Sequence, residues 1–121
     1  MQKIILFLLL AYSQTVYPMT EQDKAKAAAL ADGATTLIGV TSGSLVELNP
    51  IIGNNPTSII AFTVLKVGVS DHLSDGSANV AKSIWGGASI NNLSLLLGAS
   101  PPVAIVLGVF SGIALYHEGK P

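Results

Sequence analysis

The chain has 121 residues, of which 50% are hydrophobic and 11% charged, with a formal net charge of -1 and neither cysteine nor arginine. Soluble domains carry about 25% charged residues, so this composition covers a water-exposed surface poorly and favours residence in a membrane. The absence of cysteine excludes disulfides and thiolate metal sites, and a weakly acidic chain without arginine argues against a nucleic-acid partner.

The amino terminus has the pattern of a secretory signal peptide. Lys3 precedes an apolar run from Ile4 to Ala11, and Ala11-Tyr12-Ser13 fits the small-x-small pattern that a signal peptidase cleaves. We therefore predict a signal peptide over residues 1–13 and a polar extracytoplasmic segment over residues 14–26. The alternative is an uncleaved anchor, although the run ends at Pro18 and is shorter than the roughly 20 residues that span a bilayer.

Two spanning helices are expected next. The first covers Ala27 to Val46 and ends before Asn49-Pro50, because proline disfavours helical geometry in the residue before it. The second opens with Asn55 as N-cap and Pro56 at the first helical position, and it runs to about Leu73. The second helix contains Lys66.

A polar loop over residues 70–82 separates these helices from an apolar hairpin. Residues 83–116 contain no Asp, Glu, Lys, Arg or His, and the sequence GASPP at 98–102 divides them into two arms. Residues 27–121 are thus predicted to form an all-α membrane helical bundle of about four spanning helices after the signal-like segment. A soluble helical bundle with a very apolar core is the competing interpretation.

Paired glycines in the apolar segments indicate close helix packing. Gly39 and Gly43 form one small-xxx-small motif and Gly108 and Gly112 another, and such motifs let two helix backbones approach closely in a membrane. The packing partner is another helix of the chain, a second copy in a homo-oligomer, or another membrane protein. The sequence leaves these three open.

A polar stripe runs along the first expected helix. Its members follow one another at spacings that place them on one helix face: Asp32, Thr36, Gly39, Gly43 and Glu47. A charged side chain at membrane depth costs several kcal/mol, on the order of 3, unless it faces the bundle interior and finds a partner.

The natural partner for this stripe is Lys66, the one basic residue within an expected span. Its depth along the second helix matches Asp32 better than Glu47, so we expect an ion pair between Lys66 and Asp32. Asn91 and Asn92 on the third expected helix supply further hydrogen-bonding groups. The stripe is either structural, with these groups satisfying one another, or it lines a small binding or conduction site.

The pattern Asp-x-x-x-Thr, then Glu-x-Asn-Pro, then a helix with an intramembrane Lys resembles a family of small bacterial integral membrane proteins of unknown function. The resemblance covers about residues 28–70 and rests on Asp32, Thr35, Thr36, Glu47, Asn49, Pro50 and Lys66. It implies a membrane helical bundle, and it implies no reaction.

The expected function is that of a non-enzymatic integral membrane protein in a bacterial inner membrane or the membrane of a phage-infected cell, with the lipid bilayer as its partner. The alternative is a holin-like or other pore-forming protein. An intramembrane enzyme would have Asp32 and Glu47 as acids but no second catalytic group. Asp71, His72 and Asp75 are too few ligands in a polar loop to predict a metal site, and no cofactor is expected.

Overall fold

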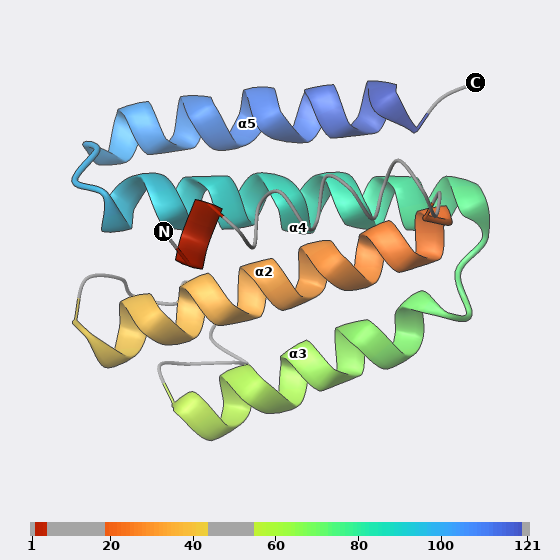
Figure 1. Cartoon of the computed structure of the whole chain (residues 1–121), viewed down its shortest axis with the longest axis horizontal. Coiled ribbons are helices and arrows are strands. Elements are labelled where there is room, and N and C mark those ends of the chain that lie inside the picture. The colour runs from red at the N-terminus through yellow and green to blue at the C-terminus, as the bar shows by residue number, and fades with distance from the viewer. Residues whose placement is uncertain (1, 5–18, 44–54, 120–121) are drawn as a thin grey trace.

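The computed structural model describes residues 2–4, 19–43 and 55–119, and within these ranges all regular structure is helical. The elements are α2 (Glu21–Thr41), α3 (Pro56–Ser70), α4 (Asp75–Leu96) and α5 (Pro101–Glu118). They lie side by side in the order α3, α2, α4, α5, each packed on its neighbour (Figure 1). The all-helical bundle expected from the sequence is therefore present, opened into a row.

Short polar side chains begin three of the helices. Thr20 accepts a hydrogen bond from the Asp23 backbone N–H, Asn55 from Thr57 and Ser74 from Ser77. Each satisfies one of the backbone donors that the first turn of a helix leaves without a partner. The predicted start of α3, with Asn55 as N-cap and Pro56 at the first helical position, is confirmed.

The first helix begins and ends earlier than the sequence analysis placed it. We expected it from Ala27 to Val46, but α2 runs from Glu21 to Thr41, because Thr20 caps it and the acidic Glu21 and Asp23 favour the positive end of a helix dipole. Gly43 adopts a positive φ of 78° just beyond its end. Residues 1–13 of the expected signal peptide, apart from the helical turn at 2–4, lie outside the described residues, as do 14–18 and Glu47.

The expected loop over residues 70–82 is much shorter in the structure. α3 ends at Ser70 instead of continuing to Leu73, and α4 begins at Asp75, where Ser74 caps it. The expectation of a loop was wrong because the polar residues from Asp75 to Lys82 form the first two turns of α4. The hairpin beyond it is present as predicted, since the turn between α4 and α5 falls at Leu97 to Ser100.

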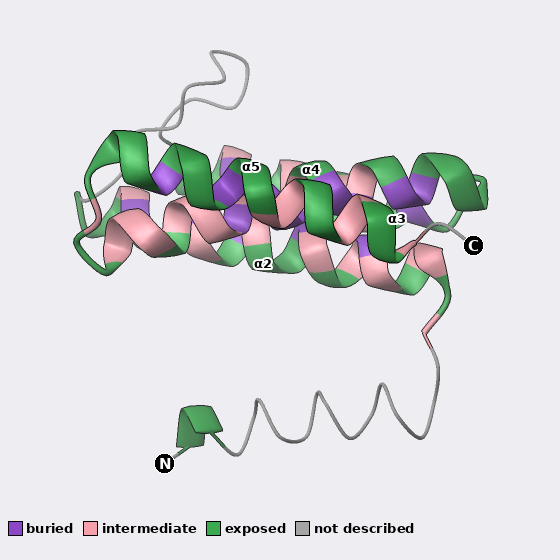
Figure 2. Ribbon diagram, turned by 90° about the horizontal axis from the view of Figure 1, so that it is seen from above, coloured by how far each residue is buried: buried purple, intermediate pink, exposed green. Residues whose placement is uncertain are grey.

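Few of the described residues are fully buried, and they are spread along the packed helices (Figure 2). The buried residues are small or polar: Ala25, Ala29, Ala78, Ala104, Thr36, Ser70, Asn79, Lys82, Ser83 and Ser89, with Ile59 as the one large apolar member among the described residues. Large apolar side chains face outward instead, as at Ile84 (63% exposed), Val64 (65%) and Phe110 (67%). Soluble domains place such side chains inside.

Glycines set the spacing between α4 and α5. A methyl group added at Gly87 would lie 2.7 Å from the carbonyl oxygen of Gly108, and one added at Gly112 would lie 3.0 Å from that of Ser83. Gly108 and Gly112 therefore pack α5 against α4, within the same chain. Gly39 is buried on α2. Gly43 lies beyond the end of that helix, and none of the described residues lies within 4 Å of a methyl group added there, so its packing role stays a prediction.

One described helix, α5, is long and apolar enough to cross a membrane on its own. α3 is apolar but shorter, α2 carries five charged residues, and α4 carries two. Only 11% of α5 is buried inside the molecule, whereas the core helix of a soluble protein is mostly buried. The arrangement of four spans is a finer statement than this, and it is taken up below as a proposal.

Candidate functional site

Three helices contribute to a group of polar side chains in the interior of the bundle, away from the helix ends. We call it the mid-bundle polar cluster: Asp32, Thr35 and Thr36 of α2, Lys66 of α3 and Asn92 of α4. The ammonium nitrogen of Lys66 lies 3.0 Å from Oδ2 of Asp32. Their side chains are 25% and 13% exposed, so the pair is largely shielded from its surroundings. The structure thus brings together the two residues that the sequence analysis expected to pair.

Asn92 ties the third helix to this pair. Its Nδ2 lies 3.3 Å from Oδ1 of Asp32, 3.2 Å from Oγ1 of Thr35 and 3.0 Å from Oγ1 of Thr36. An amide nitrogen has two hydrogens, so these three acceptors share two donors. The Thr35 hydroxyl donates to the carbonyl oxygen of Ala31, which leaves its oxygen free to accept from Asn92. Asp32 therefore receives a hydrogen bond on each carboxylate oxygen.

Two neighbours set how closely α2 and α3 approach at the cluster. A side chain at Gly33 would collide with Thr63 of α3, so only glycine allows this spacing. Trp85 of α4 also contacts the cluster, because the Lys66 ammonium lies 5.6 Å from the centre of its ring, within the range of a cation–π contact. Lys66 is therefore held by a carboxylate and by an aromatic ring.

Little room remains beside the ion pair. The cavity lined by Asp32, Thr36, Phe62, Thr63 and Lys66 has a volume of about 10 Å³, which holds one water molecule at most. A substrate or a hydrated ion does not fit there. The geometry suits a set of hydrogen bonds that connects helices better than it suits a binding pocket.

Asn91, the other expected polar residue, points elsewhere. It lines a groove of about 370 Å³ between α4 and α5 together with Gly87 and Gly108. Its Oδ1 is buried and has no hydrogen-bond partner among the described residues. Asn91 and Asn92 are adjacent in sequence but serve different faces of α4.

A second polar group lies at the end of the bundle where α2 and α4 begin and α5 ends. We call it the end charge cluster: Glu21, Lys24, Lys82 and Glu118. Lys82 Nζ lies 3.0 Å from Glu21 Oε2 and 2.7 Å from Glu118 Oε2. Lys24 Nζ lies 2.5 Å from Glu118 Oε1 and 3.4 Å from Glu21 Oε1. Two ammonium groups and two carboxylates alternate, so the cluster links α2, α4 and α5 with no net charge.

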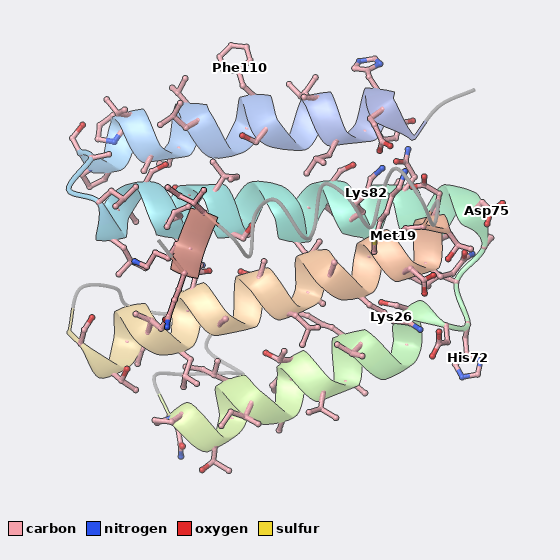
Figure 3. All side chains as sticks on the ribbon, viewed as in Figure 1. Met19, Lys26, His72, Asp75, Lys82 and Phe110 are labelled. Carbon is pink, nitrogen blue, oxygen red and sulfur yellow. The ribbon has the colours of Figure 1, made fainter. Side chains whose placement is uncertain are left out.

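Lys82 is the buried centre of this cluster, with a side chain only 3% exposed. Asn79, one turn earlier on α4, donates a hydrogen bond to the carbonyl oxygen of Tyr116 and fixes the end of α5 beside it. Figure 3 shows Lys82, Met19, Lys26, His72 and Asp75 gathered at this end of the molecule.

Sequence reasoning missed the end charge cluster. Glu21 and Lys24 were assigned to a polar segment outside the bundle, and Lys82 was assigned to a loop. Helical spacing offered a signal, because Glu21, Lys24, Ala25 and Ala28 share one face of a helix and the acidic pair follows a threonine cap. Glu118 pairs with residues far away in sequence, so its partner required the fold.

The chain matches no protein-family model, and comparisons with curated proteins and with solved structures return no similar protein. The resemblance to small bacterial membrane proteins therefore stays a prediction. Function has to be argued from the arrangement of side chains itself.

Proposed function

We propose that this chain is a small integral membrane protein without enzymatic activity, in which the mid-bundle polar cluster joins α2, α3 and α4 inside the bilayer. The observation that carries the proposal is the burial pattern: large apolar side chains such as Val64 and Phe110 face outward while alanine, serine and Lys82 lie inside. This arrangement suits a lipid environment. Lipid tails are as apolar as the side chains themselves, so no hydrophobic free energy favours moving those side chains into the interior.

We further propose that all four helices lie across the bilayer. α4, with 22 residues, is about 33 Å long, which matches a hydrocarbon core of roughly 30 Å. α3, with 15 residues, is about 22 Å long and must be extended by its flanks or by local thinning of the bilayer. The charged residues of α2 and α4 are compatible with this because they are paired or lie at one end of the row.

The small cavity beside Asp32 supports a structural role for the mid-bundle polar cluster over a conduction pathway. A pore within one copy would need a continuous polar path, and about 10 Å³ of space is not one. A pore formed between several copies is the alternative, and leakage of a small dye from vesicles containing the protein would favour it.

The proposal is tested by fractionation after expression. We expect the chain to remain with membranes after an alkaline carbonate wash and to require detergent for extraction, because its outward surface is apolar. Recovery as a monodisperse species in aqueous buffer without detergent would contradict membrane residence and with it the whole proposal.

A further inference from the structure

A groove runs over α4 between α2 and α5. It has a volume of about 380 Å³, and its lining changes along its length: Lys24, Lys82 and Glu118 stand at one end, and Ala27, Ala28 and Leu115 form apolar walls beyond them. The floor is α4 from Lys82 to Ile90, about 12 Å at the helical rise per residue. The groove is thus polar at the charged end of the molecule and apolar toward its middle.

At the charged end of the groove, some donors and acceptors have no partner among the residues that the structure describes. Each ammonium group has three N–H donors, and the hydrogen bonds of Lys24 and of Lys82 to Glu21 and Glu118 use two on each. A carboxylate offers about four acceptor positions, and the Glu118 side chain is half exposed. A ligand that presents both an anionic oxygen and an N–H donor would therefore find partners without displacing an existing ion pair.

We propose that this groove binds one phospholipid with a phosphoethanolamine headgroup, an inference that rests on the proposed membrane residence. The phosphate accepts a hydrogen bond from Lys24, whose side chain is 26% exposed, the primary ammonium donates to Glu118, and one acyl chain lies along the apolar walls. Pockets between helices at the membrane surface that contain basic side chains bind the phosphate-bearing headgroups of lipids.

The charge balance of the site selects the headgroup. Because the end charge cluster is neutral, a headgroup with both charges is matched, whereas a phosphoglycerol headgroup brings a net negative charge beside two carboxylates. A phosphocholine headgroup is also zwitterionic, but its quaternary nitrogen has no N–H to donate to Glu118. We therefore expect the order phosphoethanolamine above phosphocholine and phosphoglycerol.

The test is native mass spectrometry of the full chain released from detergent, titrated with the three lipids carrying identical acyl chains. We expect phosphatidylethanolamine to bind with one-to-one stoichiometry and about tenfold more tightly than the other two, the effect of losing a charged hydrogen bond. Lys24→Gln should weaken the binding of all three lipids, because each phosphate loses a hydrogen-bond donor, and the order of the three should persist. Ala28→Leu should weaken all three lipids alike, because it fills the apolar part of the groove.

Lys26→Gln is the matched control, since it removes the same charge from the same helix at a residue that pairs with Asp71 outside the groove. It should bind like the wild type, and circular dichroism should show that all three variants remain helical. Equal binding of the three lipids, preference for phosphatidylglycerol, no retained lipid, or an equal loss in Lys26→Gln would each overturn the proposal. A chain that proves soluble without detergent would instead refute the membrane residence on which it depends.

Discussion

At the scale of single residues, the structure separates charges that are shared from charges that are merely exposed. Asp32 receives hydrogen bonds from Lys66 and Asn92, and Lys82 donates to two glutamates, so no charge in either cluster stands alone. Such partners are required because an ionised group away from water is costly unless it is paired and hydrogen-bonded. The two clusters therefore act as joints between helices.

The Asp32–Lys66 pair should show energetic coupling. Asp32→Asn and Lys66→Met each strand a charge in a shielded position, and each should cost about 1–3 kcal/mol of unfolding free energy. The double variant should cost clearly less than the sum, because neither charge is then left alone. Thermal unfolding of the four proteins in one detergent measures the coupling, and strictly additive losses would show that the pair contributes nothing.

Lys82 should matter far more than its exposed neighbours. Lys82→Met removes the ammonium that Glu21 and Glu118 share, and the buried position predicts a loss of about 2–4 kcal/mol. Lys26→Met, which breaks an exposed ion pair with Asp71, should leave the unfolding midpoint close to that of the wild type. Equal sensitivity at the two positions would show that the end charge cluster does not hold the helices together.

At the scale of elements, the sequence predicted what local chemistry determines and missed what the fold brings together. Asn55-Pro56 marks the start of α3, and the residues from Leu97 to Ser100 mark the turn between α4 and α5. The start of α4 was missed because its first turns are polar, yet they pack on α2 and α5. The pairing of Asp32 with Lys66 was expected from depth alone, whereas the pairing of Lys82 with Glu118 depends on how α5 lies on α4.

The contact between α4 and α5 should depend on Gly87. In Gly87→Ala the new methyl group meets the carbonyl oxygen of Gly108 at 2.7 Å, so the helices must separate, at a cost of about 1–3 kcal/mol. Gly76→Ala is the control within the same helix, because nothing lies within 4 Å of the added methyl group and alanine favours helix more than glycine does. The unfolding midpoint should fall in the first variant and hold or rise in the second.

At the scale of the whole molecule, most charged residues lie at one end of the helices. Among the described parts of α2 to α5, all charged residues other than Asp32 and Lys66 lie where α2 and α4 begin and α3 and α5 end (Figure 3). The opposite ends of these four helices, with Ser42, Gly43 and the turn from Leu97 to Ser100, have no charged residue in the parts of α2 to α5 and their turns that the structure describes. This asymmetry favours a fixed orientation across the bilayer.

The two ends should therefore lie on opposite sides of the membrane. The chain contains no cysteine, so Ser74→Cys and Ser100→Cys each give a single reactive thiol at one end of the row. A maleimide that does not cross membranes should label one of these variants in sealed vesicles and both after detergent is added. Labelling of both in sealed vesicles would show that the helices do not cross the bilayer.

The proposed contact between lipid and the outward apolar surface of the four helices can be measured at Phe110. This residue is 67% exposed in the middle of α5 and points away from α4 (Figure 3). The chain has one tryptophan, so Phe110→Trp combined with Trp85→Phe places a single fluorescent probe there. In vesicles whose acyl chains carry bromine near the bilayer centre, we expect strong quenching of the tryptophan fluorescence and a blue-shifted emission maximum. Emission typical of water with no quenching would contradict it.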